Sequence, residues 1–91
     1  MKTIARFYAT WCQPCKNMEP IYDDAKKQFP DYSYIDIDID LNPQTRIDYN
    51  VRSVPTVMML EGKDEVKRLV GGASLSELKE WLANGYKKDT Q

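Results

Sequence analysis

The 91-residue sequence contains no histidine and only two cysteines, Cys12 and Cys15. A zinc site built on this pair would need two further Cys or His ligands. The chain supplies neither, so the composition excludes an intrachain zinc site of this kind. A zinc ion shared between two chains stays open as an alternative.

The sequence also lacks an excess of charge, since 13 Lys and Arg face 14 Asp and Glu. A chain without a basic surplus has no electrostatic footprint for nucleic acid. The longest apolar run, residues 54–60, is far too short to cross a bilayer, and the first residues do not resemble a signal peptide. We therefore expect no nucleic-acid or membrane partner.

The bulk composition is that of a soluble globular protein, with 42% hydrophobic and 30% charged residues. The length predicts one domain over residues 1–91, and we expect a monomer. Two cysteines without a secretory segment favour a reducing, cytoplasmic setting.

The two cysteines stand three positions apart, where an apolar run (residues 4–9) gives way to an amphipathic helical pattern (residues 17–29). A C-x-x-C pair at such a junction is typical of redox chemistry. A thiolate on Cys12 would lie over the free N–H groups of the helix, which lower the pKa of a thiol. Cys15, one turn later, could attack a mixed disulfide formed on Cys12. A purely structural disulfide is the alternative, although so short a loop contributes only about 2 kcal/mol.

Hydrophobic periodicity predicts seven elements in the order βαβαββα. A strand–helix–strand start implies parallel pairing with a right-handed crossover, and a later hairpin adds antiparallel strands. We therefore expect an α/β fold with a four-stranded mixed sheet and helices on both faces. The predicted elements are strand 4–9, helix 14–29, strand 32–40, helix 43–49 capped by Asn42, strand 54–60, strand 65–70, and a last helix from the Ser74–Glu77 capping box to Gly85.

A run of alternating carboxylates, Asp36, Asp38 and Asp40, has the spacing that opens a calcium-binding loop. Such a loop requires glycine at the position of Leu41 and a bidentate acid at the position of Ile47. Neither requirement is met, so we expect no metal site.

Taken together, these motifs resemble the thioredoxin superfamily. The similarity runs over nearly the whole chain, with two separated motifs in the right order. The matching segments are residues 7–16 (FYATWCQPCK), Pro20, residues 40–43 (DLNP), residues 49–56 (YNVRSVPT) and the Gly71–Gly72 region.

The resemblance implies a thioredoxin-like fold in which Cys12 is an exposed nucleophile and Cys15 a shielded resolving thiol. Pro55 would be cis and lie against the cysteines, and the backbone of Val54 would pair with an extended substrate segment. The implied substrate-binding residues are Tyr8, Val54, Pro55, Thr56, Gly71 and Gly72. The implied supporting residues are Trp11, Gln13, Pro14, Arg6 and Asp36.

Two of the supporting residues are open to a second interpretation. Trp11 is expected to face a partner, the alternative being ordinary core packing. Arg6 stands where thioredoxins usually keep a buried carboxylate, and Asp36 aligns with the lysine that accompanies it. We predict a charge-swapped pair beneath the cysteines, because an unpaired buried guanidinium is costly. The alternative is that Arg6 extends to solvent.

The resemblance implies a thiol–disulfide oxidoreductase that reduces protein disulfides, binds no cofactor, and receives electrons from NADPH through a thioredoxin reductase-like donor. Two alternatives stay open. Gly71–Gly72 resembles a glutaredoxin segment, which would make glutathione the electron source. The chain could also be a non-catalytic docking subunit that uses the surface around Trp11 and Pro55.

Overall fold

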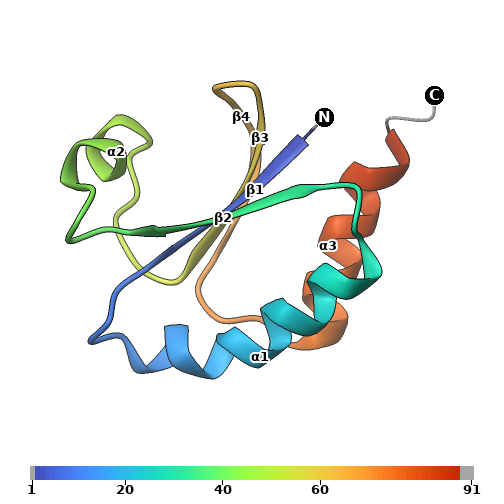
Figure 1. The fold of residues 1–91 in the computed structure, drawn as a ribbon, viewed down its shortest axis with the longest axis horizontal. Helices are drawn as coiled ribbons and strands as arrows, with labels where there is room; N and C mark the ends of the chain where they lie inside the picture. The colour runs from blue at the N-terminus through green and yellow to red at the C-terminus, as the bar shows by residue number, and fades with distance from the viewer. Residues whose placement is uncertain (1, 89–91) are drawn as a thin grey trace.

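The computed structural model describes residues 2–88, with side chains as far as Asn84. Its seven elements follow the predicted βαβαββα order (Figure 1). They are β1 (Lys2–Tyr8), α1 (Gln13–Gln28), β2 (Ser33–Asp38), α2 (Pro43–Asp48), β3 (Thr56–Glu61), β4 (Asp64–Val70) and α3 (Leu75–Lys88).

The four strands form one mixed sheet in the order β2-β1-β3-β4. Strand β1 pairs in parallel with β2 and antiparallel with β3, and β3 pairs antiparallel with β4. Helices α1 and α3 lie side by side on one face of the sheet, and α2 lies on the other side (Figure 1). The predicted fold class is therefore confirmed, and β1 is the strand that leads into the cysteine motif.

Alternation along the strands divides the apolar core into two layers, because successive side chains point to opposite faces. The layer under α1 and α3 contains Ile4, Met18, Tyr22, Ala25, Tyr32, Val57, Met59, Leu78 and Leu82. The layer on the α2 side contains Ala5, Phe7, Ala9, Cys12, Cys15, Ile39, Val51, Met58 and Leu60. Both cysteines thus belong to the second layer.

The alternating pattern predicted a strand that runs to Asp40. In the structure, β2 ends at Asp38. The Asp38 carboxylate accepts hydrogen bonds from the backbone N–H groups of Asp40 (2.9 Å) and Leu41 (3.4 Å). A side chain that bonds its own backbone two residues on turns the chain. The Asp38 side chain, which fits the alternating strand pattern, therefore ends the strand.

The predicted side-chain cap of α2 is wrong. Asn42 occupies the N-cap position but makes no capping hydrogen bond with its side chain. Its Nδ2 donates instead to the carbonyl oxygen of Asp38, at 3.0 Å. The amide therefore fastens the preceding turn rather than the helix.

The last helix begins as predicted and ends later than predicted. Glu77 accepts from the Ser74 N–H (2.9 Å), and the Glu77 N–H bonds to the Ser74 hydroxyl (3.2 Å), which is a complete capping box. The helix continues through Gly85 to Lys88, so Gly85 does not stop it. A glycine within a helix costs about 1 kcal/mol and does not by itself end one.

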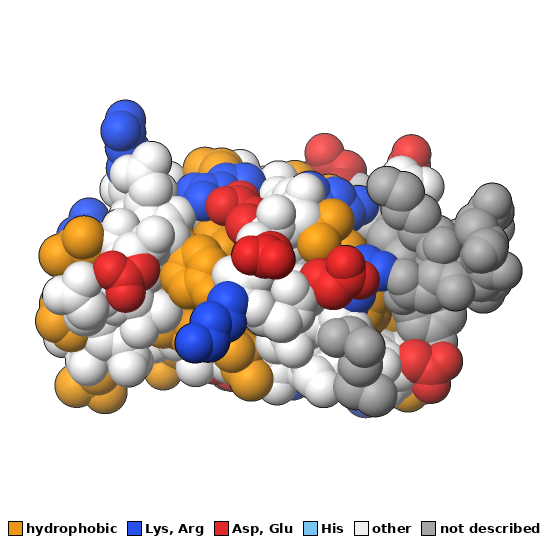
Figure 2. All heavy atoms as spheres, turned by 90° about the horizontal axis from the view of Figure 1, so that it is seen from above, with side chains coloured by type: hydrophobic (Ala, Val, Ile, Leu, Met, Phe, Trp, Pro, Cys, Tyr) orange, Lys and Arg blue, Asp and Glu red, His pale blue; other side chains and the backbone are white. Residues whose placement is uncertain are grey.

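The surface carries both signs of charge. On the face drawn in Figure 2, acidic and basic side chains are interspersed among small apolar patches. Within residues 2–88, no helix has the length and apolar character needed to cross a membrane. In the same part of the chain, no group of three His, Cys, Asp or Glu residues is placed to hold a metal ion.

Candidate active site

Cys12 and Cys15 form a disulfide where β1 gives way to α1, with their Cα atoms 5.3 Å apart. Cys12 is the N-cap residue of α1, and its Sγ accepts a hydrogen bond from the backbone N–H of Cys15 at 3.2 Å. The next amide, that of Lys16, donates to the Cys12 carbonyl oxygen at 3.2 Å. One N–H group of the first helical turn, that of Cys15, thus points at the Cys12 sulfur, in agreement with the predicted position of Cys12 at the start of the helix.

Both cysteines are buried in this disulfide form, with Cys12 4% exposed and Cys15 2% exposed. The exposed Cys12 implied by the resemblance is therefore not found in this state. The cause is the loop before β3, since Cys12 Sγ lies 3.7 Å from the carbonyl oxygen of Val54.

The loop that covers Cys12 contains a cis peptide bond between Val54 and Pro55, as predicted. The carbonyl oxygen of Pro55 accepts from the Gly71 N–H at 2.9 Å. Gly71 adopts a φ of 88°, a backbone conformation that favours glycine. The structure therefore places Val54 next to Cys12 and joins Gly71 to the neighbouring Pro55, although the contact of these residues with substrate stays a prediction.

The side chain of Thr56, a predicted substrate-binding residue, is buried and already hydrogen-bonded within the protein. Its hydroxyl donates to the Ser53 carbonyl oxygen at 2.8 Å, and the residue is 1% exposed. The hydroxyl is committed to its own loop, so the predicted substrate contact through this side chain is not supported.

Trp11 lies on the surface next to the disulfide and is 67% exposed. Its indole Nε1 donates to the Asp40 carboxylate at 2.8 Å. The core-packing alternative is therefore wrong. Asp40 was missed as a site residue, because no local pattern links positions 29 residues apart.

Gln13 and Pro14 begin α1 and are exposed. The Gln13 side-chain amide donates to the Asn17 side chain at 2.9 Å, one turn along the helix. Pro14 occupies the first turn, where a missing N–H leaves no hydrogen bond unmade. Both residues flank the cysteines at the start of α1.

Beneath the cysteines, Arg6 is buried at 5% exposure. Its Nε lies 3.3 Å from Asp36 Oδ1, and its Nη1 donates to the Cys15 carbonyl oxygen at 3.4 Å. The guanidinium also lies over the rings of Tyr8 (5.1 Å) and Tyr22 (5.2 Å). The predicted Arg6–Asp36 pair is confirmed as a contact, and the solvent-facing alternative is wrong.

Tyr22 closes this buried side of the site. Its hydroxyl donates to the Ile4 carbonyl oxygen at 3.4 Å. Burial raises the pKa of the Tyr22 phenol well above its ordinary value, and the nearby Asp36 carboxylate raises that pKa further. Tyr22 therefore stays neutral next to the Arg6 cation.

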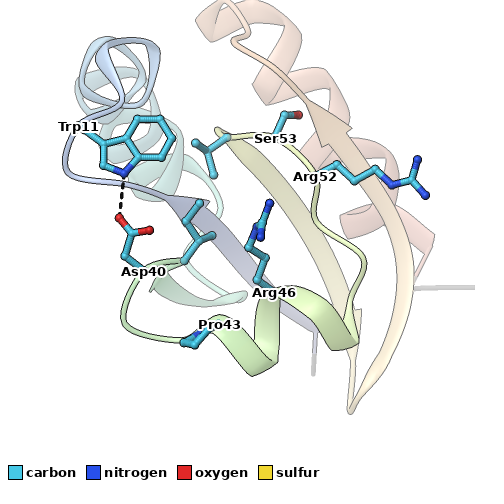
Figure 3. A pocket seen from close by; sticks show the side chains of 8 residues that line it. Trp11, Asp40, Pro43, Arg46, Arg52 and Ser53 are labelled. Carbon is cyan, nitrogen blue, oxygen red and sulfur yellow. Dashed lines mark hydrogen bonds between the residues drawn. The ribbon is translucent and has the colours of Figure 1, made fainter.

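On the side of the disulfide away from Arg6, the surface contains a hollow of about 330 Å³. Its walls include Trp11, Asp40, Arg46, Arg52, Ser53 and Val54. The Arg46 side chain extends from α2 into this hollow, whereas Arg52 points away from it (Figure 3). No local sequence pattern predicts the hollow, because its walls come from three separate segments.

Comparisons with known proteins place the chain in a family. The sequence model of the family described as Thioredoxin matches residues 1–84. Thioredoxin C-3 of Corynebacterium nephridii is 39% identical over 82 residues, which cover 90% of this chain and 57% of that protein. Thioredoxin H5 of Oryza sativa subsp. japonica is 33% identical over 69 residues, covering 76% of this chain and 51% of that protein.

Among solved structures, thioredoxin NaTrxh from Nicotiana alata superposes with a TM-score of 0.84 at 31% identity. The match covers 91% of this chain and 71% of that chain. The chain spans about half the length of the two curated relatives, at 51% and 57%.

The fold and the site together define a small α/β domain that presents a redox-type cysteine pair at the start of its first helix. The chain belongs to the thioredoxin family.

Proposed function

We propose that this chain is a thiol–disulfide oxidoreductase that reduces protein disulfides through Cys12 and Cys15. The observation that carries the proposal is the hydrogen bond from the Cys15 N–H to Cys12 Sγ at the N-terminus of α1. This geometry stabilises negative charge on that sulfur, and the thiolate is the reactive form of cysteine.

The proposed reaction starts from the reduced dithiol. The Cys12 thiolate attacks one sulfur of the target disulfide, that S–S bond breaks, and the other target sulfur leaves as a thiolate. The Cys15 thiolate then attacks Cys12 Sγ and releases the second target thiolate. Two electrons have passed to the target, and the chain is left with the Cys12–Cys15 disulfide.

Regeneration of the dithiol needs two electrons from outside the chain. We propose NADPH as their source, passed on by a thioredoxin reductase-like partner, with no bound cofactor in this chain. We further propose a cytoplasmic, monomeric protein, since a reducing compartment keeps such a pair in its dithiol form.

We assign Arg6 and Asp36 a supporting role in this reaction. A fixed positive charge beneath the pair favours the thiolate forms of both cysteines. Because arginine stays protonated, Arg6 acts through charge rather than by accepting a proton. Trp11, Val54 and Pro55 are proposed to receive the target segment at the rim of the site.

The glutathione alternative depends on the Gly71–Gly72 segment. The Gly71 N–H already donates to the Pro55 carbonyl oxygen and is not free to bind a peptide ligand. We therefore favour a reductase as the electron donor. An insulin-disulfide assay run with each donor separates the two: activity with thioredoxin reductase and NADPH supports the proposal, and activity only with glutathione contradicts it.

The cysteine roles are tested by two serine variants assayed side by side. Cys12→Ser should reduce insulin disulfides no faster than the background dithiol, because the attacking sulfur is gone. Cys15→Ser should accumulate a mixed disulfide with the target, visible as an added mass. Alkylation of wild-type Cys12 at neutral pH no faster than that of a free peptide thiol would refute the redox assignment. A double variant that keeps its biological role would favour the docking subunit.

A further inference from the structure

The hollow beside Trp11 contains an arginine without a partner. Within residues 2–88, the Arg46 side chain has no hydrogen-bond or ion-pair partner, and its Nε is buried. A buried N–H group that has no hydrogen-bond acceptor destabilises the fold unless a ligand supplies the acceptor. Arg46 therefore differs from Arg6, whose Nε and Nη1 both donate to groups of the protein.

The hollow adjoins the reactive sulfur. Val54, which forms part of its wall, has its carbonyl oxygen 3.7 Å from Cys12 Sγ. Trp11, on another wall, directly precedes Cys12 in the chain. A target segment whose cysteine is joined to Cys12 must therefore pass the mouth of this hollow.

The charge of the hollow favours an anion. Two arginines, Arg46 and Arg52, line it against one carboxylate, that of Asp40. The Asp40 carboxylate already accepts a hydrogen bond from the neighbouring Trp11 indole, at 2.8 Å. Arg52 is turned away from the hollow and donates to the Asn50 side chain at 3.3 Å. Arg46 is left as the cation that meets an incoming group (Figure 3).

We propose that Arg46 selects target proteins that carry an acidic side chain close to the cysteine attacked by Cys12. The guanidinium fork matches the two oxygens of a carboxylate, and charge-assisted hydrogen bonds of this kind are stronger than neutral ones. Arg46 is thus a specificity-determining residue of the proposed reaction, and the inference rests on that proposed function.

The test compares pairs of disulfide-bonded peptides that differ only by Glu or Gln within a few residues of the cysteine. The chain is first reduced with dithiothreitol, and the rate constant for a single turnover is measured at low and high salt. At the best position, wild type should reduce the Glu peptide about fivefold faster than the Gln peptide. High salt should shrink this ratio, because screening weakens an exposed ion pair.

Three variants assign the preference to Arg46. Arg46→Gln should bring the ratio close to one, and Arg46→Lys should retain part of it. The matched control is Lys27→Gln, which removes one positive charge from an exposed position of α1 and should keep the full ratio. Helix α2 has no buried residue, so Arg46→Gln should fold normally.

Two results would overturn the inference in distinguishable ways. If wild type reduces both peptides equally, or Arg46→Gln keeps the ratio, the selection by Arg46 is wrong while the reductase function stands. If wild type reduces neither peptide beyond the uncatalysed rate, the proposed function fails and the inference fails with it.

Discussion

The two sides of the disulfide are built in opposite ways, each around one arginine. Beneath Cys15, Arg6 is 5% exposed and contacts Asp36, a backbone carbonyl oxygen and two aromatic rings. Beside Cys12, Arg46 lies in an open hollow and has no side-chain partner within the described residues. In the proposed reaction, the satisfied cation adjusts the sulfur chemistry and the unsatisfied one is available to a ligand. Under that proposal, reactivity and target choice are assigned to different walls of one site.

The largest effect is expected from removing the buried cation. Arg6→Met keeps much of the side-chain volume but deprives the Cys15 carbonyl oxygen of its donor, and should lower the free energy of unfolding by about 1–2 kcal/mol. It should also raise the pKa of the cysteine thiols, because the favourable positive charge is gone. The measurement is the pH dependence of thiol alkylation in the reduced protein.

A second arginine pair provides the control for that experiment. Arg68 pairs with Glu65 on β4, away from the cysteines, and lowers the pKa of the Glu65 carboxyl through its hydrogen bond. Arg68→Met should leave the thiol titration unchanged. An unchanged titration in Arg6→Met as well would remove Arg6 from the mechanism.

A smaller effect is expected at Tyr22, on the same buried side. Its pKa is raised in the folded protein above the ordinary value of 10.0. The folded state therefore favours the protonated phenol, so this contribution to stability is fully present below pH 10.0 and is lost as the pH rises above it. Between neutrality and pH 11, the free energy of unfolding of Tyr22→Phe should fall less steeply with increasing pH than that of wild type, as measured by urea denaturation. Parallel stability curves for the variant and wild type would contradict this.

The smallest effect is expected on the open side. Asp40→Asn keeps an oxygen to accept from the Trp11 indole but removes the negative charge from the hollow. Stability should change by no more than about 0.5 kcal/mol. The Glu-over-Gln peptide ratio should rise about twofold, since the repulsive carboxylate is gone. A fall in the ratio would show that Asp40 does not oppose an incoming anion.

The sequence was sufficient where the signal is local or repeated. The Ser74–Glu77 capping box, the cysteine pair at the start of a helix and the strand periodicities each depend on neighbours within a few residues. The Arg6–Asp36 contact was foreseeable in another way, through the resemblance, because the two residues stand where thioredoxins usually keep a buried carboxylate and its lysine. In the structure they are register partners on adjacent parallel strands. A buried guanidinium without a partner is costly, which made an opposite charge at the accompanying position a reasonable expectation.

Prediction failed where distant segments meet. The Trp11–Asp40 hydrogen bond joins two loops, and the hollow around Arg46 exists only once the loop before β3 faces α2. The end of β2 was missed for a related reason. The Asp38 carboxylate competes with the strand for backbone N–H groups, and alternation alone does not reveal this.

Helix α2 carries Arg46 and buries none of its own residues. Substitutions along its surface therefore disturb the packed interior little, while each one alters the wall that a passing polypeptide meets. The cysteines lie on a separate helix, anchored at the end of a central strand. Related proteins could therefore evolve a different set of target proteins through substitutions in this one short helix, while the proposed cysteine chemistry stays the same.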